Sequence, residues 1–230
     1  DAIEKDSNTL SGKPWVYWMP PSVRSAFKSF PRLADVAEPR VGLQSSDNFR
    51  FLKFWWEVGR SRIGFDCASS EEAVRTGKKW FPHMKGGGFR RWWGNQEFIV
   101  NWLSDGREMK AWADPLYNNS GWSRIIKSVE FYFRPGATWS HTSSSGFSVR
   151  SMPAGFICNV EAMAAFPSRP EINSDFLTAV LNSRLVHFIL TALNPTLHVG
   201  ASEARDLPLP IVSDSKRAQL ELMATDAIAL

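Results

Sequence analysis

The chain has 230 residues, of which 43% are hydrophobic and 22% charged, a composition typical of a globular protein with a sizeable core. Its formal net charge is only +4, and no apolar run approaches the roughly 18 residues that a membrane-spanning helix requires. The two cysteines, Cys67 and Cys158, lie far apart, which excludes a disulfide scaffold and favours a reducing cytoplasm. The four histidines show no metal-ligand spacing. The chain begins without a secretory signal or an initiator Met, so we expect a fragment of a longer protein.

Local signals in the first part of the chain predict short strands joined by irregular loops. Ser22 is expected to cap a helix that closes before Pro31. Ser69 and Glu72 form a capping box, so a helix should begin there and end near Gly77. Residues 49–58 fit a strand, or one helical turn that runs into a strand. Further strands are predicted over 13–19, 80–84, 89–93, 97–102, 129–134, 137–140, 148–152 and 155–160, and a helical segment over 108–113.

The last third of the chain changes character. Ser174 can cap a long amphipathic helix over 175–193, and a second helix is expected over 215–230. The proline-rich segment 206–212 must be extended between them. The sequence therefore predicts an α+β fold with an irregular, mostly antiparallel twisted sheet region and helices packed at the C-terminal end. We expect a β-rich region over 1–165 and a helical scaffold or spacer over 166–230.

The familiar catalytic motifs are missing. The chain has no phosphate-binding loop, no dinucleotide fingerprint and no nucleophile elbow. It also lacks an Asn-Pro-Pro-aromatic motif, and no carboxylate pair stands out. The sequence therefore favours a protein that recognises a ligand over one that carries out catalysis, and we assign no catalytic residue, metal or cofactor to this chain.

The most informative segment, residues 78–102, interleaves basic residues, three glycines and aromatic residues. Between Ala73 and Gln96 lie six of the 27 Lys and Arg residues and none of the 23 Asp and Glu residues. A local cationic patch on a nearly neutral chain is typical of a protein that binds a polyanion. A solvated basic hairpin explains the same composition equally well. Six of the 11 tryptophans lie between Trp55 and Trp102, where they serve either as core residues or as stacking platforms.

Candidate contacts follow from the chemistry of these side chains. Lysine and arginine neutralise phosphates, whereas Arg, Asn and Gln also form paired hydrogen bonds with base edges. A hydroxyl-rich turn around Ser144 and the turn at residues 44–48 are further candidates, although each is equally an ordinary polar turn. Among the candidate DNA contacts, Ser144 would bond a phosphate or a base, and Trp92 would pack on a sugar or a guanidinium face or belong to the core. The candidate phosphate contacts are Lys78, Lys79, Lys85 and Arg150, and the candidate base or groove contacts are Arg90, Arg91, Asn95 and Gln96.

Several segments resemble one family in the same order along the chain. They are GLQSSDNFRF at 42–51, FWWEVG at 54–59, KWFPHMKGGGFRRWWGNQEFIVNW at 79–102, FYFRPGATWSHTSSSGFSVRSMPAGFI at 131–157, LTAVLNSRLVHFILTALNPTLHVG at 177–200 and DLPLPIV at 206–212. Together they resemble the C-terminal, TaqI-like target-recognition part of large adenine-specific DNA methyltransferases, of the phage-exclusion (BREX) or fused restriction–methylation type. The family usually reads Gly-Leu-x-Thr-Gly-Asp-Asn at the first segment, and here Ser46 stands in place of the second glycine.

The resemblance implies a division of labour within a longer protein. A methyltransferase domain upstream, in cis, would bind S-adenosylmethionine and hold the flipped adenine, while this chain would read double-stranded DNA in the bacterial cytoplasm. Other defence-system subunits are further expected partners, and no membrane is. Two other functions fit the sequence: a module that docks a partner subunit or a phage inhibitor through its aromatic surface, and a carbohydrate-binding module, which only the tryptophan content favours.

Overall fold

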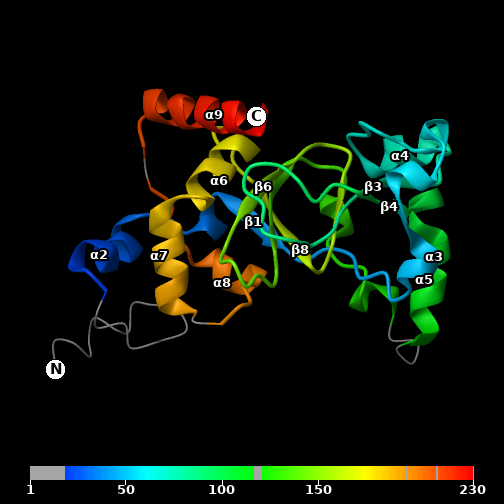
Figure 1. The fold of residues 1–230 in the computed structure, drawn as a ribbon, viewed down its shortest axis with the longest axis horizontal. Coiled ribbons are helices and arrows are strands. Elements are labelled where there is room, and N and C mark those ends of the chain that lie inside the picture. The colour runs from blue at the N-terminus through cyan, green and yellow to red at the C-terminus, as the bar shows by residue number, and fades with distance from the viewer. Residues whose placement is uncertain (1–18, 117–120, 195, 211, 230) are drawn as a thin grey trace.

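The computed structural model describes residues 19–116, 121–194, 196–210 and 212–229 (Figure 1). These residues form two four-stranded sheets with helices around them, which confirms the predicted α+β class. The strand predicted over 13–19 lies almost entirely outside the described residues. The division of the chain at residue 165 stays a prediction.

The first sheet has the strand order β1-β8-β5-β6, and all of its neighbouring strands are antiparallel. β6 is an edge strand, and Thr138 of β5 lies opposite Arg150 of β6. The strands are β1 (Ala37–Arg40), β5 (Gly136–Ser140), β6 (Val149–Met152) and β8 (Ala162–Pro167).

The second sheet has the order β2-β4-β3-β7, with one parallel pair, β3 and β7. β3 and β4 are antiparallel neighbours, so the segment that joins them turns back on itself. The strands are β2 (Leu52–Phe54), β3 (Trp80–Met84), β4 (Phe98–Asn101) and β7 (Ile157–Cys158).

The helices gather at the two ends of the molecule. Figure 1 shows α6, α7, α8 and α9 beyond the first sheet, and α3, α4 and α5 beside the second. No single described helix is long and apolar enough to cross a membrane; α6 and α7 reach that length and apolarity only together, and they meet at 62°. The helices are α2 (Pro21–Ser29), α3 (Asn48–Phe51), α4 (Ser70–Thr76), α5 (Leu103–Leu116), α6 (Ser174–Leu181), α7 (Arg184–Leu193), α8 (Ala201–Arg205) and α9 (Asp214–Ala229).

The apolar side chains form two main clusters, and β6 and β8 of the first sheet contribute to both of them. Trp139 of the first sheet packs with residues of α6 and α7, among them Phe176 and Ile189. Trp102, at the end of β4, packs with Phe81 and other aromatic side chains of the second cluster. Both tryptophans are fully buried, so they are core residues and are not available for stacking on a ligand.

Several local predictions are confirmed. The Ser69 hydroxyl accepts a hydrogen bond from the Glu72 amide at 3.2 Å, and Gly77 ends α4 in the left-handed conformation with φ 61°. The ambiguous segment 49–58 is a helical turn, α3, that runs directly into β2. Capping and turn signals involve neighbours in sequence, which is why they can be read without knowledge of the fold.

Other local predictions are wrong. Ser22 and Ser174 lie inside α2 and α6 and cap neither helix, and Asn173 caps α6 by accepting from the Phe176 amide at 2.8 Å. The segment 129–134 is not a strand, because residues Val129–Phe131 form a 3-10 helix and Phe131, Tyr132 and Phe133 are all buried, which an alternating strand exposed on one face does not allow. The helix predicted over 175–193 is broken into α6 and α7. The Ser183 hydroxyl caps α7 by accepting from the Val186 amide at 3.2 Å, while the Asn182 side chain bonds both backbone groups of Val149.

Gly42 fixes the segment that leads into α3. A Cβ atom at this position would lie 2.2 Å from the carbonyl oxygen of Cys158, so the two backbones meet too closely for any other residue. The amide of Leu43 donates to that same carbonyl at 2.9 Å. The loop of residues 44–48 is thereby held beside β7.

We expect Gly42→Ala to lower the free energy of unfolding by about 1–3 kcal/mol, because the added methyl group must displace backbone. Gly59→Ala is the matched control, since its Cβ would meet nothing within 4 Å. Urea denaturation of the two variants checks the prediction. Equal stability of both variants would contradict the close approach.

Candidate nucleic-acid interface

Residues 85–97 join β3 to β4 and cross to the first sheet on the way; we call them the strap. The predicted strand over 89–93 is wrong, since only Trp92 makes a bridge, with Arg150. The Trp92 amide donates to the Val149 carbonyl at 2.9 Å, and the Ser151 amide donates to the Trp92 carbonyl at 2.8 Å. The strap is therefore attached to the open edge of β6 and ties the two sheets together.

Two residues in the second half of the strap have a left-handed backbone conformation. Trp92 has φ 71° and Asn95 has φ 57°, a left-handed conformation that is costly for a bulky side chain such as Trp. The side-chain Nδ2 of Asn95 donates to the Gly88 carbonyl at 3.0 Å, so this side chain holds the two limbs of the strap together. Residues held in such conformations cluster at functional sites.

The cations of the strap lie toward solvent. Arg90 and Arg91 are exposed, and Lys85 is half-buried with its ammonium group 5.8 Å from the centre of the Phe98 ring. Within the described part of the chain, none of these three residues forms an ion pair with a carboxylate. Arg91 lies over the Phe89 ring, with the guanidinium carbon 5.6 Å from the ring centre. Their positive charges are consequently available to an anionic ligand.

Lys78 and Lys79 lie at the opposite end of β3 from Lys85. The Lys78 ammonium group donates to the Ser61 carbonyl, and that of Lys79 lies 5.7 Å from the centre of the Trp80 ring. A strand rises about 3.3 Å per residue, so roughly 20 Å of chain separates the two groups of cations. The single patch expected from the sequence is therefore two basic groups on one sheet.

The remaining predicted contacts differ in accessibility. Ser144 is exposed at the turn between β5 and β6, whereas Trp92, Asn95 and Gln96 are partly buried. Arg150 is fully buried, with its Nη2 atom 3.3 Å from the Ser140 hydroxyl. Burial lowers the pKa of Arg150 to about 10, which leaves it cationic at neutral pH. A phosphate contact by Arg150 therefore requires the strap to move.

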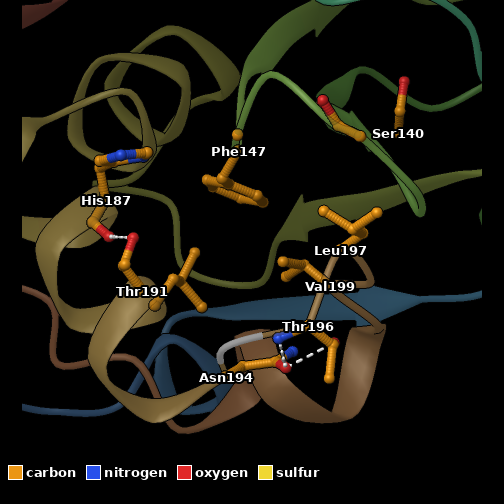
Figure 2. A pocket seen from close by; sticks show the side chains of 11 residues that line it. Ser140, Phe147, His187, Thr191, Asn194, Thr196, Leu197 and Val199 are labelled. Atoms are coloured by element: carbon orange, nitrogen blue, oxygen red, sulfur yellow. Dashed lines mark hydrogen bonds between the residues drawn. The ribbon is translucent and has the colours of Figure 1, made fainter.

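A small pocket lies beneath the turn that carries Ser144, between this turn and α7 (Figure 2). Its volume is about 70 Å³, and Phe147 and His187 face one another across it. That space holds a few water molecules at most and is too small for a nucleobase.

A larger polar cleft of about 440 Å³ lies at the start of the strap, where Lys85 is part of its lining. It brings Lys85 together with the loop 44–48 that the sequence singled out, and it adds Asn159 and Glu161, which the sequence did not suggest. Ser46 has the left-handed φ of 57° at the position where the resembling family has glycine. The Ser45 hydroxyl donates to Asn48 Oδ1 at 2.5 Å, and Asp47 caps α3 by accepting from the Arg50 amide at 3.1 Å. The loop is thus held by its own side chains.

His83 supports the floor beside this cleft. Its side chain is completely buried, and its Nε2 atom lies 3.0 Å from the amide nitrogen of Asn159. Burial first, and then the positive charge of Lys85, lower the pKa of His83 to about 3. The imidazole is therefore neutral, and its Nε2 accepts a hydrogen bond from the side-chain Nδ2 of Asn159. The side-chain Oδ1 of Asn159 in turn accepts from the Glu161 backbone amide at 2.8 Å.

Exposed aromatic side chains lie at the end of β2 and in the 3-10 turn that follows it, Trp55–Glu57. Phe54 and Trp56 stack with their ring centres 4.6 Å apart, and Phe54 also contacts Phe98 at 4.7 Å. Trp55 is 48% exposed and Trp56 is 55% exposed. Sequence reasoning assigned none of these residues to a site; the run Phe-Trp-Trp without apolar–polar alternation was the available signal.

Neutral burial of His83 predicts a pH-dependent stability. Because the folded pKa of about 3 lies below the unfolded value of 6.5, the unfolded state binds more protons below pH 6.5, and folding becomes less favourable as the pH falls. The free energy of unfolding should lose up to about 1.4 kcal/mol per pH unit below pH 6 relative to His83→Gln. Urea titrations between pH 7.5 and 5 check this. Parallel stability profiles for the two proteins would contradict it.

No protein-family model matches this chain. Two curated relatives do. The chain is 29% identical to the adenine-specific methyltransferase BrxX of Escherichia coli O9:H4 (strain HS) over 231 aligned residues. The alignment covers 100% of this chain and 17% of BrxX. It is 31% identical to the adenine-specific methyltransferase PglX of Lacticaseibacillus casei (strain Zhang) over 202 aligned residues. That alignment covers 87% of this chain and 16% of PglX. The chain is thus homologous, over its whole length, to about a sixth of the length of adenine-specific methyltransferases.

Proposed function

We propose that the chain is the sequence-specific DNA-recognition region of an adenine-N6 DNA methyltransferase in a bacterial phage-defence or restriction–modification system. The observation that carries this proposal is the strap, which presents Lys85, Arg90 and Arg91 without a carboxylate partner among the described residues. Homology to part of adenine-specific methyltransferases supports the parent activity. A base-modifying enzyme acts on one flipped nucleotide, so a recognition region that positions it has to bind the duplex in a defined register.

The two basic groups suit a duplex. Each flanks one end of β3, and Lys78, Lys79 and Lys85 neutralise backbone phosphates in this proposal. Arg90 and Arg91 enter a groove, where a guanidinium group forms paired hydrogen bonds with guanine. Phosphate contacts fix the register of the protein on the duplex, and the base contacts of the strap supply the sequence preference.

The other candidate residues have supporting roles. Asn95 holds the strap through its bond to Gly88, and Gln96 carries a buried Nε2 atom with no partner among the described residues. Both amides suit adenine when the strap rearranges on a duplex. Ser144, exposed at its turn, is placed to donate to a phosphate oxygen.

The chemistry of methyl transfer belongs to another part of the parent protein in this proposal. An upstream domain in cis binds S-adenosylmethionine and holds the flipped adenine, and this chain takes no cofactor. Other subunits of the defence system are further partners. The free thiols of Cys67 and Cys158 suit the cytoplasm of a bacterium.

The exposed aromatic side chains favour a second function. Trp55 and Trp56 lie on the surface in the 3-10 turn that follows the edge strand β2, and large exposed apolar patches mark protein interfaces. A partner subunit or a phage inhibitor docked there would be held through buried aromatic surface. Such binding should survive the ionic strength that abolishes phosphate contacts.

We expect Arg91→Ala to weaken binding to duplexes selected from a random library by about 1–3 kcal/mol and to relax the preference at one base pair. Arg205→Ala, an equal charge change at an exposed position of α8, should leave affinity unchanged. Fluorescence anisotropy with selected and scrambled duplexes measures both effects. If Arg91→Ala weakens the two kinds of duplex equally, the base-reading role is wrong.

Lys79→Ala should act differently, because a lysine on a phosphate does not distinguish sequences. We expect affinity for all duplexes to fall alike and the slope of log affinity against log salt to decrease in magnitude by about 1. Binding isotherms between low and physiological salt measure the slope. Unchanged slope and affinity would remove Lys79, and with it this end of β3, from the interface.

A further inference from the structure

Arg150 lies under the strap on the face of the first sheet that the strap covers. Thr138 of β5 is its partner in the register, so its side chain shares a face with Thr138 and Ser140. The Ser140 hydroxyl donates to the Gly87 carbonyl at 3.1 Å and lies 3.3 Å from the Gly87 amide. Ser140 therefore connects the guanidinium group of Arg150 to the glycine turn of the strap.

This guanidinium group is short of partners. It carries five N–H donors, yet within the described residues only Nη2 has a hydrogen-bond partner, while Nε and Nη1 have none. No described carboxylate forms an ion pair with it, and its exposed fraction is 0%. A buried and unpaired cation is strongly destabilising unless a counter-ion reaches it. The fold therefore maintains a costly group that no described carboxylate contacts directly, since Glu97 acts on Arg150 only through its more distant negative charge.

The strap is built so that it can lift. It is attached to the edge of β6 by the two backbone hydrogen bonds of Trp92 and to Ser140 of β5 through Gly87, and its first limb contains the glycines Gly86, Gly87 and Gly88. A Cβ at Gly88 would meet nothing within 4 Å, so an incoming group can approach the backbone there. Release of Trp92 from its left-handed conformation relieves strain and offsets part of the lost hydrogen bonding.

We propose that Arg150 binds a backbone phosphate of DNA, and that the strap lifts from β6 to admit it. The proposal rests on the DNA-recognition function proposed above and deepens it. A guanidinium group matches two phosphate oxygens at once, which uses the donors that are unpaired in the closed form. The Ser140 hydroxyl, which is released from the Gly87 carbonyl when the strap lifts, adds one further donor. Arg90 and Arg91 move with the strap and engage the same duplex.

The first experiment compares Arg150→Met with the unsubstituted chain. Methionine fills similar space without charge, so the free variant should melt several degrees higher, while its affinity for duplex DNA should fall at least tenfold. Arg205→Ala is the control for loss of one positive charge and should change neither quantity. Unchanged DNA affinity in Arg150→Met, with any change in melting temperature, would overturn the proposal and leave Arg150 a structural residue. Failure of the unsubstituted chain to bind any duplex would instead overturn the proposed function, and this inference with it.

The second experiment follows the strap directly and does not depend on a variant. Amide hydrogen exchange reports the hydrogen bonds of the Trp92 and Ser151 amides. Addition of duplex DNA should reduce the protection of both amides, while the β5–β8 ladder stays protected. Increased protection of both amides on binding would show that the strap stays closed, and would overturn the proposal even if Arg150→Met failed to fold.

Discussion

The backbone of Trp92 pairs with the edge of β6 beside Arg150, and the arrangement of the candidate interface depends on this pairing. It closes an edge that would otherwise present unpaired backbone groups. It also fixes the strap between the two sheets, so that Lys85, Arg90 and Arg91 belong to one surface. Without this pairing, the long connection of residues 85–97 between β3 and β4 would have no backbone attachment to the first sheet.

The pairing places contrasting chemistry on the two sides of the strap. Outside, the basic and aromatic side chains are accessible; inside, a cationic guanidinium group is sealed against Ser140. A loop that carries recognition residues gains precision when it is attached to rigid strands at more than one point. In the closed form described here the strap is attached to β3, β4 and β6, so Lys85, Arg90 and Arg91 are held on one surface before a duplex binds.

Much of this fold can be predicted from the sequence where the signals are local. Ser69, Glu72 and Gly77 define α4, and the strand predicted over 97–102 contains β4. The strap could not be predicted, because Trp92 meets Arg150 only after the chain has passed through another 58 residues. Burial of Arg150 was missed for the same reason, since no neighbour in sequence indicates that a glycine turn covers it. The helix break at Asn182 depends likewise on a bond to the distant Val149.

The central claim is that the strap faces DNA, and site-specific photocrosslinking tests it most directly. A benzophenone amino acid is placed either at Phe89, on the exposed part of the strap, or at Leu222, which is 65% exposed on α9. After illumination with a radiolabelled duplex, we expect a covalent product from the variant at position 89 and none from the variant at position 222. Crosslinking from position 222 alone would contradict the account.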